Sequence, residues 1–276
     1  MPTQTEKALA FRALHQRPGA FVIPNPWDAG SARLLSALGF EALATTSAGY
    51  TFMLGRSEGS ISLSEALDNA RAIVETTDLP VSVDLENGFG HDPKDCAAAI
   101  RAAYAAGLVG GSIEDATGDE ARPIYDFAQS VERVEAAVEA ARALLTPFVL
   151  TARSENFLHG RPDLDDTIRR LQAFEKAGAE VLYAPGLTKL EQIRAVCSSV
   201  SRPVNVVMGL VGGSFSVQQL AEVGVKRISL GSTLARVAYG ALTRAAREIS
   251  EEGTFSFAAQ AIPFAEINRQ MRPKGA

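Results

Sequence analysis

The stretch VSVDLENGFG, residues 81–90, begins as a β-branched apolar run and ends in two glycines, Gly88 and Gly90. This pattern predicts a buried strand that breaks into a loop. Side chains alternate along a strand, so Asp84 and Glu86 are expected on the same face. Two carboxylates there are costly unless a positive charge lies between them, and a hard cation such as Mg2+ prefers oxygen ligands. The alternative is a strand end whose acids cap the next helix or meet water.

The same pattern, a short apolar run followed by a longer amphipathic stretch, recurs about eight times along the chain. The apolar runs are residues 21–24, 42–47, 81–86, 110–115, 148–153, 181–185, 204–208 and 227–230. The amphipathic stretches are residues 31–38, 62–77, 92–106, 131–145, 163–177, 189–200, 216–223 and 233–250. Runs that are apolar throughout are typical of strands buried on both faces, and this number of β/α units closes a parallel barrel.

We therefore predict an α/β fold, a (β/α)8 TIM barrel, with residues 1–276 forming a single domain. Residues 253–276 form a C-terminal helical extension in this interpretation. Within it, an additional helix is predicted over residues 255–271, with apolar residues on one side. That helix is expected either to dock on the same barrel or to be donated to a partner subunit.

Composition and charge exclude several function classes. The chain has 276 residues, is 46% hydrophobic and 21% charged, and carries a net charge of −5 without a basic cluster, so nucleic-acid binding is not expected. No apolar run is long enough to span a bilayer, and residues 1–17 lack the core of a signal peptide. Cys96 and Cys197 lack metal-site spacing and fit a reducing compartment. We expect a soluble, cytoplasmic protein, with His15 and His159 at its surface.

Polar residues stand at the ends of three neighbouring predicted strands. Asp84 and Glu86 end the third apolar run, Glu114 ends the fourth, and Arg153 ends the fifth. Because barrel active sites lie at the C-terminal ends of the strands, these side chains are expected at one mouth. Asp84, Glu86 and Glu114 could hold Mg2+ or Mn2+, directly or through the waters of the ion.

Arg153 has two interpretations. Its guanidinium could bind a substrate carboxylate through two parallel hydrogen bonds. It could instead form a structural ion pair with Glu155 or Glu114. Asp115, beside Glu114, is interpreted as a candidate helix cap.

The segment TTSAG, residues 45–49, follows the second apolar run. Small residues let backbone N–H groups approach a ligand closely, so a loop here could form an anion pocket. Thr46, Ser47 and Ala48 are the candidate substrate-binding residues of this segment. Asp28, after the first run, either caps the following helix or belongs to the site.

These residues match a known family in order along the chain. The matching segments are NPWDAGSA at 25–32, TSAG at 46–49, LG at 54–55, DLENGFG at 84–90, SIED at 112–115 and TAR at 151–153. Over nearly its full length, the chain resembles the isocitrate lyase/phosphoenolpyruvate mutase superfamily. The ordered set carries the resemblance, because any single segment would be unspecific.

The resemblance implies an α/β barrel whose last helix is exchanged between subunits, usually in homodimers or homotetramers. It also implies chemistry that forms or stabilises a pyruvate-like enolate with Mg2+. The implied site residues are Asp84, Glu86 and Glu114 near the metal, the backbone N–H groups of Ser47 and Ala48 for a carboxylate or enolate oxygen, and Arg153 for another anionic group. Thr46 and Asn205 complete the expected substrate-binding set, and Glu114 and Arg153 are also expected to be catalytic.

The chain departs from the family pattern where the lyases carry a cysteine acid in a mobile loop. The corresponding segment here, residues 116–125, contains no cysteine. Proton transfer is then expected from water on the metal, from Tyr125 or from His91. Glu58 stands where family members commonly have aspartate.

We therefore expect a Mg2+-dependent carbon–carbon lyase or decarboxylase that acts on a small 2-oxo or hydroxy (di)carboxylic acid. Decarboxylation demands less of an acid, because the enolate can be protonated after CO2 leaves. Two alternatives are a phosphoenolpyruvate mutase or phosphonate-cleaving enzyme and a catalytically silent carboxylate-binding homologue.

Overall fold

A computed structural model describes residues 1–209 and 213–272 of the chain. Its centre is an eight-stranded parallel sheet in the order β1-β8-β7-β6-β5-β4-β3-β2. The strands are β1 (Phe21–Ile23), β2 (Leu43–Ala44), β3 (Val81–Asp84), β4 (Gly110–Glu114), β5 (Val149–Arg153), β6 (Val181–Tyr183), β7 (Val204–Val207) and β8 (Val225–Ser229). At the remaining seam, the N–H of Ala44 donates to the carbonyl of Pro24 at 3.1 Å. The sheet is thus a nearly closed barrel, as predicted.

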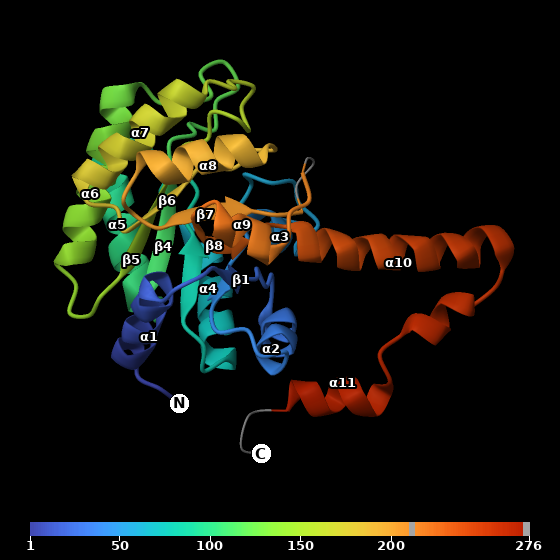
Figure 1. The fold of residues 1–276 in the computed structure, drawn as a ribbon. Coiled ribbons are helices and arrows are strands. Elements are labelled where there is room, and N and C mark those ends of the chain that lie inside the picture. Colours follow the sequence, from blue (N-terminus) through green and yellow to red (C-terminus); the bar gives the residue numbers. More distant parts are fainter. Residues whose placement is uncertain (210–212, 273–276) are drawn as a thin grey trace.

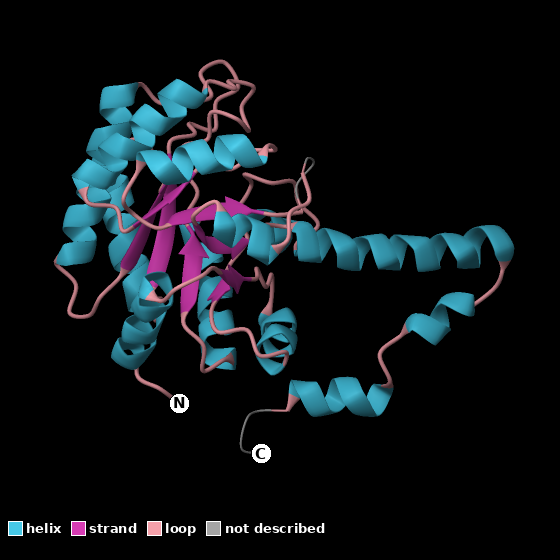
Figure 2. Cartoon of the chain, in the orientation of Figure 1, coloured by secondary structure: helices cyan, strands magenta, loops and turns pink. Residues whose placement is uncertain are grey.

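Helices surround the strands, and a long arm leaves the barrel at its C-terminal end (Figures 1 and 2). The helices are α1 (Gln4–Gln16), α2 (Ala29–Ala37), α3 (Ser47–Met53), α4 (Leu63–Thr76), α5 (Pro93–Ala105), α6 (Phe127–Arg142), α7 (Leu164–Ala177), α8 (Leu190–Ser199), α9 (Val217–Glu222), α10 (Thr233–Glu252) and α11 (Phe264–Met271). A 3-10 helix, η1 (Ser256–Gln260), joins α10 to α11. No helix in residues 1–209 and 213–272 has the length and apolarity needed to cross a membrane.

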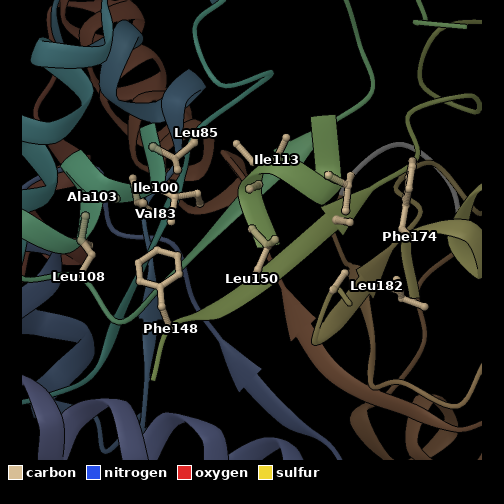
Figure 3. Packing of buried hydrophobic residues seen from close by; sticks show 14 of the residues in the cluster. Val83, Leu85, Ile100, Ala103, Leu108, Ile113, Phe148, Leu150, Phe174 and Leu182 are labelled. Carbon is tan, nitrogen blue, oxygen red and sulfur yellow. The ribbon is translucent and has the colours of Figure 1, made fainter. Parts of the chain in front are cut away.

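The main core lies between the strands and the outer helices. Figure 3 shows Val83 of β3 and Leu150 of β5 facing this layer, with Ile100 of α5 and Phe174 of α7 packed close by. A second cluster fills the lower barrel, where Phe11 of α1 is fully buried against strand residues. Strand side chains that point out of the barrel therefore pack against the helices, and strand side chains that point into the barrel line the cavity.

Helix starts follow their sequence signals. Asp28 Oδ1 accepts the N–H of Ser31 at 2.6 Å, so Asp28 caps α2, one of its two predicted roles. Ser62 and Asp163 accept N–H groups at the starts of α4 and α7 in the same way. Each cap satisfies a backbone donor that the first helical turn leaves free.

The C-terminal arm differs from the single helix predicted over residues 255–271. That segment is divided into η1 and α11, with Ala261 in an extended conformation and Pro263 directly before α11. Proline lacks a backbone N–H and disfavours a helical residue before it, so a continuous helix cannot pass through this point. The arm turns back and places α11 beside α2 (Figure 1).

Candidate active site

Arg153, the last residue of β5, lies among three carboxylates at the mouth of the barrel. Its Nη1 is 3.1 Å from Asp84 Oδ1, its Nη2 is 3.2 Å from Glu114 Oε2, and its Nε is 2.8 Å from Glu155 Oε1. Burial alone would lower the pKa of Arg153, but Glu155, Glu114 and Asp84 outweigh it and raise the pKa well above the usual range. Arg153 therefore remains a cation and joins the ends of β3, β4 and β5.

Asp84 is held from several directions. Ser47 Oγ donates to Asp84 Oδ2 at 3.0 Å, and Ser112 Oγ lies 3.4 Å from Oδ1. The backbone N–H of Asp84 donates to Thr45 Oγ1 at 3.0 Å. These contacts come from β3, β4 and the segment after β2, so the carboxylate has a fixed orientation toward the cavity.

Glu86 reaches the site by a different route from the one predicted. The strand ends at Asp84, two residues earlier than the predicted run, and Glu86 has a left-handed backbone with φ 47°. Its carbonyl accepts the N–H of Glu114 at 3.0 Å, which ties this loop to β4. A left-handed conformation is uncommon for a residue other than glycine and is a feature of functional loops. The turn, rather than strand alternation, places Glu86.

The acids at this mouth are crowded. Burial, followed by the negative charges of Asp84 and Glu58, raises the pKa of Glu86 to about 7. Burial and Asp84 likewise raise the pKa of Glu58. Burial is also the largest cause that raises the pKa of Glu114 well above its usual range. This clustering of raised pKa values is typical of a functional site.

A cavity of about 230 Å3 lies in the barrel beside these acids; Asp84 and Glu58 line it, whereas Glu86 and Glu114 are not among its described lining residues. Its lining includes Asp84, Arg153 and Glu58 at the mouth, and Asn205 and Arg227 further down. Thr46, Ser47 and Ala48 also line it, as predicted substrate-binding residues. Such a concave space with a few convergent polar groups is suited to a small polar ligand.

The segment predicted as a loop at 45–49 instead begins α3. Thr46 is the N-cap, and its Oγ1 accepts the N–H of Gly49 at 3.2 Å. Ser47 and Ala48 are the first two helical residues, whose N–H groups have no partner within a helix. The structure therefore presents these two donors on a helix start rather than on a loop.

Tyr125 and His91, the predicted proton donors, contact each other. His91 Nδ1 lies 2.7 Å from the Tyr125 hydroxyl, and Asn87 Nδ2 donates to that hydroxyl at 3.4 Å. Tyr125 is fully buried, with the guanidinium of Arg133 4.3 Å from its ring centre. Among the described residues that line the cavity, neither Tyr125 nor His91 appears. Their catalytic roles remain predictions.

Asp115 and His15 have structural positions. Asp115 Oδ1 accepts the N–H of Glu155 at 2.7 Å and its Oδ2 pairs with Arg170 at 3.2 Å, so Asp115 braces the strand ends instead of capping a helix. The expectation that His15 lies at the surface is wrong, because His15 is buried under the barrel. It packs edge-to-face against Phe11 and Phe21.

Several site residues were not predicted. Glu155 was expected at the end of the fifth strand and as an ion-pair partner of Arg153, but was not assigned to the site; it is the most deeply buried of the acids around Arg153, with 2% of its side chain exposed. Tyr183 places its ring 5.0 Å from the Arg153 guanidinium. Arg227 begins the eighth predicted run, directly after Lys226, and its charge at the start of a strand was the available signal.

The acids at the mouth fit a divalent cation in one of the two predicted modes. No three Asp, Glu, His or Cys side chains within residues 1–209 and 213–272 converge closely enough to hold a metal directly. The predicted set of Asp84, Glu86 and Glu114 is therefore not a closed cage of direct ligands, because Arg153 lies between Asp84 and Glu114. However, Glu86 Oε1 is buried without a hydrogen-bond partner in the described residues, and a hydrated Mg2+ would satisfy it. The donor set fits Mg2+ held partly through water, the second predicted mode.

This geometry agrees with what sequence comparison shows. Residues 11–250 match the sequence model of the phosphoenolpyruvate phosphomutase family. The chain belongs to the isocitrate lyase/phosphoenolpyruvate mutase superfamily. A solved structure from Burkholderia cenocepacia J2315, described as a lyase or mutase whose activity is not established, is 59% identical to this chain. Its TM-score is 0.97, and the match covers 98% of this chain and 97% of that chain.

Two curated relatives have named activities. A 2-methylisocitrate lyase of Halalkalibacterium halodurans is 28% identical over 91% of this chain and 85% of its own. An oxaloacetate decarboxylase of Paraburkholderia xenovorans is 29% identical over 92% of this chain and 85% of its own. Relatives in the superfamily are thus of the lyase and decarboxylase type.

Proposed function

We propose that this superfamily member is a Mg2+-dependent carbon–carbon lyase or decarboxylase that acts on a small 2-oxo or hydroxy (di)carboxylic acid through a pyruvate-like enolate. The observation that carries the proposal is the contact of Arg153 with Asp84 and Glu114 at the rim of a small polar cavity. The named activities of the two curated relatives, a 2-methylisocitrate lyase and an oxaloacetate decarboxylase, support the same reaction class.

The metal would be held by Asp84, with Glu86 and Glu114 contributing through water. Bound there, Mg2+ or Mn2+ supplies Lewis-acid polarisation of a substrate oxygen. Burial first, and then the charges of Asp84 and Glu58, raise the pKa of Glu86, and a cation bound beside it would favour the ionised form. Ser47 Oγ and Ser112 Oγ, which contact Asp84, fix the orientation of the carboxylate.

The substrate would be positioned by the chain itself. The N–H groups of Ser47 and Ala48, at the start of α3, have no backbone acceptor among residues 1–209 and 213–272 and would donate to a carboxylate or enolate oxygen. Arg153 is assigned to a second oxygen of the ligand, and its three carboxylate partners limit how far it can move. Thr46 and Asn205 complete the wall of the cavity.

Proton transfer is assigned to solvent, or to Tyr125 through its 2.7 Å contact with His91. Tyr125 N–H donates to the carbonyl of Asp115 at 2.9 Å, so the hydroxyl lies at the end of a segment anchored next to Glu114. Closure of residues 116–125 would bring this group toward the mouth and exclude water.

We also infer a homodimer or homotetramer in which the arm, α10 to α11, is exchanged between subunits. Apolar side chains are exposed along it: Val237, Leu242, Ile249, Phe255, Ile262 and Phe264. A second subunit that packs on the arm would bury these side chains.

The function is tested with a panel of 2-oxo acids, hydroxy dicarboxylic acids and phosphonates in the presence of Mg2+. Turnover of a carboxylic acid that stops in EDTA and returns with metal supports the proposal. Asp84→Asn is expected to lower turnover at least about 100-fold while leaving the unfolding midpoint nearly unchanged. Undiminished turnover in EDTA, or release of phosphate in place of carbon–carbon cleavage, would refute it.

A further inference from the structure

A second positive charge lies at the floor of the cavity. Arg227, on β8, lines the cavity and is 5% exposed. Its Nε donates to Asn205 Oδ1 at 2.8 Å, and its Nη2 donates to Thr151 Oγ1 at 2.9 Å. Its Nη1 lies 3.4 Å from His15 Nε2. The guanidinium is therefore fixed by β5, β7 and α1.

All three acceptors are uncharged. His15 Nδ1 lies 2.8 Å from the carbonyl of Phe11, which can only accept, so Nδ1 carries the proton and Nε2 is left to accept from Arg227. Burial, followed by the charge of Arg227, lowers the pKa of His15 to about 3. His15 is consequently neutral at physiological pH and cannot balance the guanidinium.

No Asp or Glu pairs with Arg227 among the residues that the structure describes. Arg153 at the mouth contrasts with it, because three carboxylates surround that guanidinium. Burial lowers the pKa of Arg227 to about 10, which leaves it charged at neutral pH. A buried charge without a counterion is costly, and a guanidinium has five N–H donors, of which three are used here. Two donors remain for an anion.

The distance between floor and mouth suits a short ligand. Thr151, which Arg227 contacts, precedes Arg153 by two residues in β5, a rise of roughly 6.6 Å. Small polar side chains line the cavity between these levels: Ser82, Ser112 and Ser229. A ligand can thus reach the acids and Arg153 with one end and Arg227 with the other.

We propose that Arg227 is a second anion-binding subsite, which selects substrates that carry a carboxylate at each end. The distal carboxylate binds Arg227 at the floor, while the reacting end lies at the mouth. This inference rests on the proposed function and sharpens it, because it makes a short dicarboxylate, rather than a monocarboxylate, the preferred substrate class. Asn205 positions Arg227 through its Oδ1 and also donates to Ser229 at 3.0 Å.

The test is equilibrium binding by calorimetry, with Mg2+ present, of succinate and of its half-amide succinamate. Neither contains the 2-oxo or hydroxy group of the expected substrates. Wild-type protein is expected to bind succinate about 10- to 100-fold more tightly than succinamate. This affinity ratio corresponds to the contribution of one charged hydrogen-bonded group. Arg227→Gln is expected to abolish that ratio by weakening succinate alone, and Arg227→Lys is expected to retain part of it.

Lys226→Gln is the matched control. It removes the same charge from the neighbouring residue, whose Nζ donates to the carbonyl of Gly19 at 2.6 Å, and the ratio should remain that of the wild type. A wild-type protein without preference for succinate, or Arg227→Gln with the wild-type ratio, would overturn the proposal. If Arg227→Gln does not fold, the proposal is tested by the affinity ratio of the wild type and by that of Arg227→Lys.

The outcome is independent of turnover. A preference that depends on Arg227, together with no metal-dependent turnover in the substrate panel, supports the subsite and rejects the proposed reaction. Metal-dependent turnover with a succinate ratio that is insensitive to Arg227 supports the reaction and rejects the subsite.

Discussion

The position of Glu86 in the folded protein costs free energy of stability. Its backbone is left-handed, its Oε1 is buried without a partner in the described residues, and burial together with Asp84 and Glu58 raises its pKa to about 7. In the unfolded chain the same carboxyl ionises near 4.5. Between these two values the folded protein holds the proton more tightly than the unfolded chain. The free energy of unfolding therefore falls as pH rises through this window.

We predict that, in EDTA, the protein is less stable to denaturant at pH 8 than at pH 5. At about 1.4 kcal/mol for each pKa unit, Glu86 contributes at most about 3 kcal/mol to this loss. Glu86→Gln should flatten the pH profile and raise stability at pH 8, and Mg2+ should do the same for the wild type. Burial also raises the pKa of Asp115 to about 7, so Glu86→Gln removes part of the slope. A variant profile that runs parallel to that of the wild type would contradict this account.

At the scale of elements, β3 carries polar site residues at its C-terminal end and apolar core residues along the strand. Val83 belongs to the main core with Ile100 of α5 (Figure 3), and Ser82 and Asp84 are among the residues that line the cavity. Most helices pack outside the strands, but α3 begins at the mouth, and Cys96 Sγ, near the start of α5, donates to the carbonyl of Asn87 at 3.7 Å. Cys96 lies in α5 and Cys197 in α8, and burial raises the pKa of each thiol to about 11.

We predict that a cysteine-free mechanism operates. Cys96→Ser together with Cys197→Ser should retain turnover within a few-fold on the substrate that the panel identifies, because neither thiol is among the described residues that line the cavity and the raised pKa makes each a weak proton donor. The measurement is kcat and KM beside those of the wild type, with Mn2+ affinity as a check on the site. A loss of about 100-fold or more in kcat, with metal affinity and folding intact, would show that a thiol is the general acid.

At the scale of the whole molecule, the barrel and the arm have different surfaces. The arm extends from the barrel through α10 and returns through α11 (Figure 1). Leu242, Phe255 and Phe264 are 64%, 65% and 83% exposed. These values belong to a surface that a second subunit is expected to cover.

We predict that a chain ending at Gly253 dissociates or aggregates, because it lacks η1 and α11 but retains the exposed face of α10. Light scattering gives the mass, and circular dichroism checks that the barrel remains folded. Replacing Phe264 by Ser in the full chain is the milder companion variant and should weaken association in the same direction. A soluble truncated protein with the mass of the full-length assembly would contradict the exchange of the arm.

The sequence by itself determined the eight β/α units and the grouping of Asp84, Glu114 and Arg153. Apolar periodicity reports burial locally, and parallel barrel strands bring their C-terminal ends together whatever the details of packing. The caps at Asp28, Ser62 and Asp163 were predictable for a similar reason, since each acts within three residues of itself. Family membership was predictable as well, because the order of the matching segments is a property of the chain alone.

Tertiary structure alone decided how Glu86, His15 and Arg227 are placed. Glu86 reaches the acids through a left-handed turn, which no strand periodicity encodes. His15 and Arg227 are far apart in the chain. They meet because α1 packs against the floor of the barrel, where the side chain of Arg227 extends from β8. A charge in an apolar run gives no sign of its partners. Its surroundings depend on which distant strands and helices share the interior, and that is settled only when the barrel closes.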